Sequence, residues 1–248
     1  MNAPAERIAG ALQLARIIRR LKEDVHPGEL GGETVEQFVR RYSRVRLPRL
    51  DLNMQSEYDP SWPETFEREK RRLQAALAGE NVIGVEHIGS TSIPYLSSKN
   101  ILDIAVAMRA PLSTERQSRI LAELGYQAYG ESPIAETFSW FWRIGTGGES
   151  SFVVHTCPAD SQRFTDVKNF RDFMRAYPEE QERYVDLKRE LAAVPGQSWL
   201  EYSVSKKILV ARITARANAW ANAHETHAHE THENAVTTLV PGHQPQTP

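Results

Sequence analysis

The chain has 248 residues, 40% of them hydrophobic, so it is long enough to bury a substantial core and is not disordered throughout. Lys and Arg number 30 against 32 Asp and Glu, which leaves no overall basic field to hold nucleic acid. The single cysteine, Cys157, excludes an internal disulfide framework. No stretch reaches the roughly 18 apolar residues of a membrane span and the N-terminus lacks a signal-peptide core, so we expect a cytoplasmic protein with no membrane partner.

An N-terminal extension over residues 1–50 is predicted to be helical. Residues 7–22 carry apolar side chains near helical spacing and an arginine-rich opposite face, and a Pro-Gly break separates them from a second helix over 34–42. The basic helix could bind a partner, a membrane surface or RNA, and it could mediate oligomerisation. Packing on the main domain with solvated charges is the interpretation we favour.

The main domain, residues 51–217, opens with a helix over 64–77 and a strand over 82–88 that ends at Gly89-Ser90-Thr91-Ser92. The next strand, over 101–108, is apolar except for Asp103, which predicts a central position in a sheet.

A helix over 113–124 follows, and then strands over 139–144 and 151–156 that Gly147-Gly148 would join as a hairpin. Helices dominate residues 167–217. This order predicts an α+β fold, with a mixed sheet flanked by helices.

Residues 218–248 are polar and include a His/Glu repeat over 224–232, which predicts a disordered His-rich tail. Alternating His and Glu could hold a transition metal. Without a core to fix its geometry or a second shell, we do not expect a functional metal site there.

Asp103 is the most costly residue of the predicted sheet, because a buried carboxylate requires a cationic partner or a metal. It could form a structural salt bridge, or it could bind Mg²⁺ where the strand meets bound phosphates. The Gly89-Ser90 turn before it offers backbone N–H groups and hydroxyls of the kind that hold phosphate.

The run from Val85 to Pro94, continuing through Lys99 to Ile104, closely resembles the GrpB-like family of predicted nucleotidyltransferases. The resemblance covers about residues 58–213. It implies a nucleotidyltransferase-like fold and a cleft between the Gly-Ser turn and Asp103. It also implies the nucleotide-binding candidates His87, Gly89, Ser90, Thr91, Ser92, Lys99, Arg143, Arg171, Lys188 and Lys206.

The chain departs from the superfamily pattern at Ala105, where enzymes usually have a second carboxylate on the same side of the strand as Asp103. Two-metal chemistry is therefore in doubt. Tyr95 and Asn100 stand where family members tend to have Gly and Pro, and the Tyr95 ring could stack on a base or fill a gap.

Glu86 and His87 point to opposite faces of their strand, so only one of them can readily face the cleft. We expect His87 to face the phosphates and Glu86 to act as a catalytic residue and metal ligand beside Asp103, or to pair with a lysine. His155 lies on a strand that often carries a third acidic residue in nucleotidyltransferases. It could be a ligand, a general base or a core histidine.

These features favour a Mg²⁺-dependent enzyme that transfers a nucleotidyl group from an NTP, ATP being our first choice, to a small-molecule acceptor. The alternatives are an inactive nucleotide-binding regulatory module, which Ala105 favours, and a structural interaction protein that uses the N-terminal helices.

Overall fold

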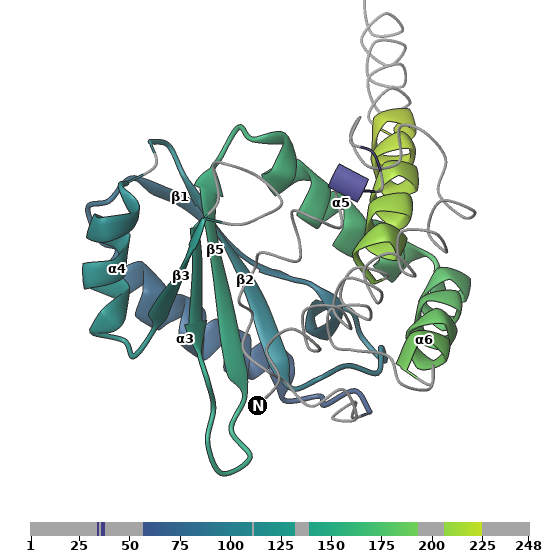
Figure 1. The fold of residues 1–248 in the computed structure, drawn as a ribbon, viewed down its shortest axis with the longest axis horizontal. Coiled ribbons are helices and arrows are strands. Elements are labelled where there is room, and N and C mark those ends of the chain that lie inside the picture. The colour runs from purple at the N-terminus through teal and green to yellow at the C-terminus, as the bar shows by residue number, and fades with distance from the viewer. Residues whose placement is uncertain are drawn as a thin grey trace, which may run out of the picture.

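The computed structural model describes residues 34, 36, 37, 57–110, 112–131, 139–192 and 206–224. Within these ranges, the helix nearest the C-terminus covers residues 206–224 and appears in yellow-green in Figure 1. None of the helices in these ranges is long and apolar enough to cross a membrane. The remaining elements are, in order, α3 (Trp62–Ala76), β1 (Val82–Ile88), the 3-10 turn η1 (Ser90–Ser92), β2 (Ile101–Met108), α4 (Thr114–Ala122), β3 (Gln127–Glu131), β4 (Ser139–Arg143), β5 (Ser151–Pro158), α5 (Gln162–Ala176) and α6 (Pro178–Ala192).

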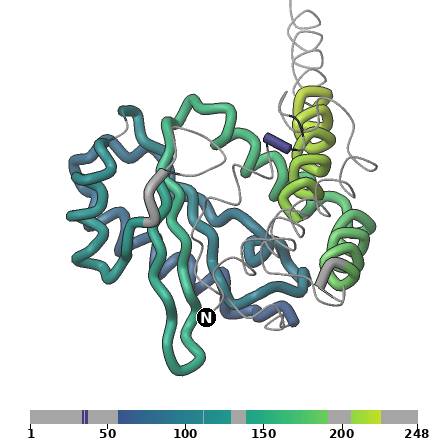
Figure 2. The backbone as a smooth tube through the Cα atoms, in the orientation of Figure 1, coloured from purple at the N-terminus to yellow at the C-terminus, as the bar shows by residue number. Residues whose placement is uncertain are grey.

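The five strands form one mixed sheet in the order β1-β2-β5-β4-β3. β2 and β5 pair in parallel, and the other neighbouring strands are antiparallel. The β4–β5 hairpin extends beyond the other strands (Figure 2). This is the α+β architecture expected from the sequence, with a mixed sheet flanked by helices.

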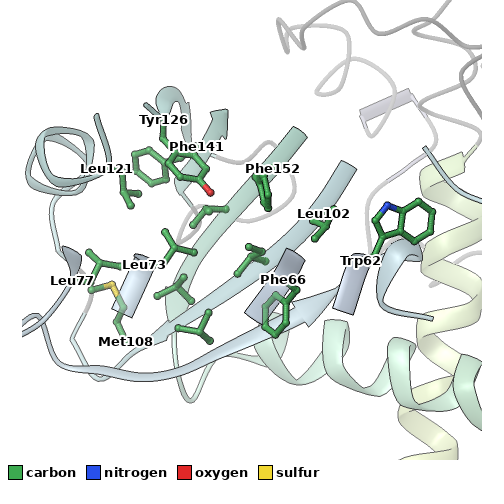
Figure 3. Packing of buried hydrophobic residues seen from close by; sticks show 14 residues of the cluster. Trp62, Phe66, Leu73, Leu77, Leu102, Met108, Leu121, Tyr126, Phe141 and Phe152 are labelled. Carbon is green, nitrogen blue, oxygen red and sulfur yellow. The ribbon is translucent and has the colours of Figure 1, made fainter. Parts of the chain in front are cut away.

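One face of the sheet carries the main hydrophobic core, drawn in Figure 3. Alternate residues of β2, Leu102, Ile104 and Val106, are fully buried there against α3 and α4. Trp62, at the start of α3, is also fully buried, and its indole Nε1 donates to Asn100 Oδ1 over 2.9 Å. Because successive side chains of a strand point to opposite faces of the sheet, Asp103, between Leu102 and Ile104 of β2, lies on the face opposite this core.

Helical elements cover part of that opposite face. In Figure 1, α5, α6 and the 206–224 helix gather on one side of the sheet. A second hydrophobic cluster binds them to the loop after η1, and its buried members are Ile93, Leu96, Phe170, Phe173, Met174, Tyr184, Ile213 and Ala217. The face of the sheet that carries Asp103 is thus partly covered by a separately packed helical layer.

The helix that starts at residue 206 continues to 224, past the boundary at 217 that the sequence predicted for the folded domain. The physical reason is Trp220, whose ring contacts Phe173 and Tyr177 at centroid distances of 5.9 and 6.2 Å. Residues 225–248 lie outside the described ranges, as does the helix expected over 7–22. Of the helix expected over 34–42, only residues 34, 36 and 37 are described.

Candidate functional site

The Gly-Ser turn connects β1 to the loop before β2. The Thr91 hydroxyl donates to Ile101 O over 3.2 Å, and the Ser92 hydroxyl donates to Gly89 O over 2.6 Å. Thr91 and Ser92 are buried, whereas Ser90 is half-buried. Of these three predicted phosphate-binding residues, Ser90 is the one most open to a ligand.

Gly89 allows this turn to pass directly over the carboxylate of Asp103. Its φ of 68° and ψ of −169° fall in a region that is essentially restricted to glycine. A Cβ at this position would fall 2.9 Å from the Cβ of Asp103. The close approach explains why the turn needs a glycine where β1 passes Asp103.

Asp103 and His155 form a pair on the face of the sheet opposite the main core, with Oδ1 and Nε2 separated by 3.3 Å. Their side chains are 34% and 11% exposed. Burial alone would raise the pKa of Asp103, but the hydrogen bond from His155 and the charges of Lys206 and Lys207 hold it below its ordinary value. Burial also lowers the pKa of His155, against the opposing effect of Asp103. At neutral pH the pair is an ionised carboxylate beside a neutral imidazole.

Lys206 and Lys207, at the start of the C-terminal helix, supply positive charge beside this pair. The Lys207 amine lies 5.9 Å from the centre of the Trp140 ring, and Trp140 contacts His155 edge-on at 5.4 Å. Burial, followed by the charges of Arg163 and Lys206, lowers the pKa of Lys207 to about 7, although Asp103 opposes the shift. The site therefore has one carboxylate beside Lys206 and a Lys207 amine that is only partly protonated at neutral pH, and a bound anion would favour the protonated amine.

Lys188 and Lys99 extend this positive charge toward the loop after η1. The Lys188 amine donates to Ser97 O over 3.0 Å and is almost fully buried. Burial, with the charges of Lys206, Lys99 and Arg189, lowers its pKa to about 7. Lys188 supports the loop directly, and its amine also adds to the local positive potential.

The model of the GrpB protein family matches residues 55–216, which include the turn, Asp103, His155 and Lys206. The chain belongs to the GrpB family. A UPF0157 protein of Halalkalibacterium halodurans is 32% identical over 66% of this chain and 81% of that protein. Another, from Streptomyces coelicolor, is 33% identical over 66% and 83%. The crystal structure of the conserved protein GrpB from Enterococcus faecalis has a TM-score of 0.57 and 29% identity, and the match covers 67% of this chain and 99% of that one.

In this GrpB protein, Glu86 lies on the same face as Asp103 but is bound by an arginine. Arg171 Nη1 lies 2.7 Å from Glu86 Oε2, and the same nitrogen donates to His87 O over 3.1 Å. Across the strands, Ala105 lies between Glu86 and His155. Arg171 also binds the carboxylate of Asp172, with Nε 2.8 Å from Oδ1, so it is shared by two carboxylates and is not directed at the Asp103–His155 pair.

His87 and Arg143 lie on the core face, away from Asp103, although the sequence predicted both as phosphate contacts. The His87 ring stacks on Phe66 with 4.8 Å between centroids, and its Nε2 lies 3.0 Å from Thr91 Oγ1. Arg143 Nη2 lies 2.6 Å from Glu69 Oε2. In both cases the alternation of side chains along a strand decides the face. His87 can affect a ligand only by supporting the turn beneath it.

A two-ion metal centre does not fit the donor atoms of this site. Ala105 offers no ligand, and Arg171 occupies Glu86. In the described part of the chain, no group of three or more His, Cys, Asp or Glu side chains is placed to hold a metal. A single Mg²⁺ that arrives with a nucleotide does fit, because Mg²⁺ is commonly bound by one carboxylate together with phosphate oxygens and water.

The sequence interpretation did not include Lys207 or Trp140 among the site residues. The signal for Lys207 was weak: it follows Lys206, and neighbouring residues of a helix point about 100° apart. Trp140 pairs across the sheet with His155, and this register is visible only once β4 and β5 are paired.

Proposed function

We propose that this GrpB protein binds a Mg²⁺-bound NTP at Asp103, on the face of its sheet opposite the main core, and transfers the nucleotidyl group to a small-molecule acceptor. The observation that carries the proposal is the ionised Asp103 hydrogen-bonded to the neutral His155, beneath a glycine turn and beside two lysines. The phosphates would lie against the turn and the amines of Lys206 and Lys207. Hydrogen bonds between ammonium groups and phosphate oxygens are charge-assisted and therefore stronger than hydrogen bonds between neutral groups.

His155 would act as the general base. With Nε2–H donating to Asp103, the other ring nitrogen is free of that bond and can accept the proton of an acceptor hydroxyl. The acceptor oxygen bonds to the α-phosphorus, the bond from that phosphorus to the bridging oxygen breaks, and pyrophosphate leaves. Asp103 fixes the orientation of the imidazole and stabilises the imidazolium that forms.

Magnesium would be held by Asp103 and by the phosphates of the nucleotide, and it would supply charge neutralisation. Because the protein supplies a single carboxylate, its own affinity for Mg²⁺ would be low, and the ion would bind together with the nucleotide. The Asp103 side chain, about a third exposed, has one oxygen paired with His155 and a second with which to contact such an ion.

The test uses each of the four NTPs with Mg²⁺ and a small-molecule filtrate of bacterial extract as the source of acceptor. Pyrophosphate release is measured, and mass spectrometry identifies a product heavier by one nucleotidyl group. His155→Gln should bind the nucleotide analogue with a methylene between the α- and β-phosphates as tightly as wild type, yet release no pyrophosphate. Equal turnover by His155→Gln would contradict the assignment of the base.

The second candidate function is a regulatory module that binds nucleotide without transferring it. Ala105 and the Arg171-bound Glu86 favour it, because the usual additional carboxylate ligands are absent or already paired with an arginine. Tight binding of Mg²⁺-NTP with no product in any filtrate would select this candidate. In both cases we propose a cytoplasmic location, where NTPs are available and a single cysteine stays reduced.

A further inference from the structure

A groove of about 920 Å³ opens next to the Gly-Ser turn, between the loop after η1 and α6. Its wall combines apolar and aromatic surface with groups of both charges, a composition typical of small-molecule sites. The lining residues that matter here are Pro94, Tyr95, Leu96, Arg175, Glu182 and Arg189.

The Tyr95 ring forms an exposed aromatic shelf on this groove. It is 89% exposed, and its backbone has a φ of 66°, which is unfavourable for a residue with a side chain. The ring lies 5.8 Å from that of Tyr58, which contacts the fully buried Trp62 edge-on at 5.4 Å. Tyr95 is thus supported from one side while it contributes little to the core, so folding alone does not account for the strained backbone.

Arg175 joins the groove to the turn. Its Nε and Nη2 donate to the carbonyl oxygen of Ser92 over 3.1 and 2.7 Å, and its side chain also lines the groove. Tyr95 follows Ser92 by three residues, so their Cα atoms are at most about 11 Å apart. A nucleotide with its phosphates at the turn could therefore extend its ribose and base toward Tyr95.

We propose that this groove is the nucleobase subsite of the nucleotide site, with the base stacked on Tyr95. The inference rests on the proposed binding of an NTP at Asp103. The Glu182 carboxylate on α6 is a hydrogen-bond acceptor on this groove and can bind the exocyclic amino group of a base. Adenine, guanine and cytosine have such a group and uracil does not.

The experiment measures the binding of five Mg²⁺-loaded ligands to the full chain by calorimetry: ATP, GTP, CTP, UTP and inorganic tripolyphosphate. Tyr95→Gly removes the ring at a backbone conformation that glycine adopts freely, so the fold should persist, and a melting curve verifies this. Tyr95→Phe keeps the ring. Ile83→Ala is the matched surface control, because Ile83 is 55% exposed at the opposite end of β1 from the turn.

Tyr95→Gly should weaken NTP binding by about 5- to 150-fold, the usual contribution of one base–aromatic stack, and leave tripolyphosphate binding unchanged. Tyr95→Phe and Ile83→Ala should bind like wild type, and Glu182→Gln should reduce the preference for ATP over UTP. If Tyr95→Gly binds NTPs as tightly as wild type while tripolyphosphate also binds, the nucleobase subsite is wrong and the phosphate site stands. If neither NTPs nor tripolyphosphate bind wild type, both proposals fail.

Discussion

Replacing Gly89 by alanine should damage both the stability of the fold and the ligand site. The backbone conformation of Gly89 costs a residue with a Cβ about 1–3 kcal/mol. The new methyl group would also press on the Cβ of Asp103 at 2.9 Å, and such overpacking typically costs about 1–3 kcal/mol more. A total of about 4 kcal/mol lowers the melting temperature by about 8–16 °C in a protein of this size.

Gly147→Ala is the matched control, because Gly147 has a similar φ of 61° in the β4–β5 hairpin and nothing within 4 Å of its added Cβ. It should lose only about 1–2 kcal/mol and keep wild-type affinity for Mg²⁺-tripolyphosphate. Gly89→Ala should lose that affinity even at temperatures where it is folded, because Asp103 must move. Thermal melts by circular dichroism and calorimetric titrations measure both effects. If the two variants melt alike and bind alike, the turn does not constrain Asp103.

Three further predictions test the placement of other residues. Glu69→Ala should destabilise the fold by about 3–5 kcal/mol in chemical unfolding, because it leaves the side chains of Arg143 and Tyr126 without their shared carboxylate. The affinity of the folded variant for tripolyphosphate, measured by calorimetry, should stay unchanged. A changed affinity would indicate that Arg143 takes part in binding. Burial lowers the pKa of His87 to about 4. Between pH 6.5 and 4 the imidazole is therefore protonated in the unfolded chain and neutral in the native state. Wild type should lose about 3 kcal/mol of stability as pH falls through that window, and urea titrations of His87→Gln should lack that part of the loss. Lys207→Met should weaken tripolyphosphate binding about tenfold or more. The variant should melt no lower than wild type, because an apolar side chain replaces a desolvated amine. Unchanged affinity would show that Lys207 does not contact the phosphates.

Local patterns were sufficient to predict most of the sheet. The predicted ranges of the strands at 82–88 and 101–108 agree with β1 and β2, and the Gly147-Gly148 hairpin is confirmed between β4 and β5. Strand β3 was not predicted, because it is a short edge strand with no clear apolar alternation. Its pairing with β4 depends on tertiary contacts that a local pattern does not contain.

The site was predictable to the extent that it depends on strand alternation and on one motif. Asp103, Gly89 and Ser90 lie together as expected, and register brings His155 to Asp103. The placement of His87 depended on knowing which face of β1 meets α3, and the sequence interpretation chose the wrong face.

Side chains from distant elements could not be placed from the sequence at all. Arg143 pairs with Glu69 across the core, and Arg171 pairs with Glu86. In the sequence, both arginines appeared equally suited to bind phosphate, because the carboxylate that pairs with each of them lies far away along the chain and is identified only by the fold.

The measurement that tests the central claim most directly is a calorimetric titration of a non-hydrolysable NTP into wild type and Asp103→Asn, each with and without Mg²⁺. Asparagine keeps the shape of the side chain and an oxygen to accept from His155, and it removes the charge that would hold the cation. Asp103→Asn should lose the Mg²⁺-dependent gain in affinity and keep the Mg²⁺-free affinity, with a melting temperature equal to or above that of wild type. If Asp103→Asn melts far lower without ligand and still shows the wild-type gain with Mg²⁺, Asp103 is a structural residue and the proposed site is wrong.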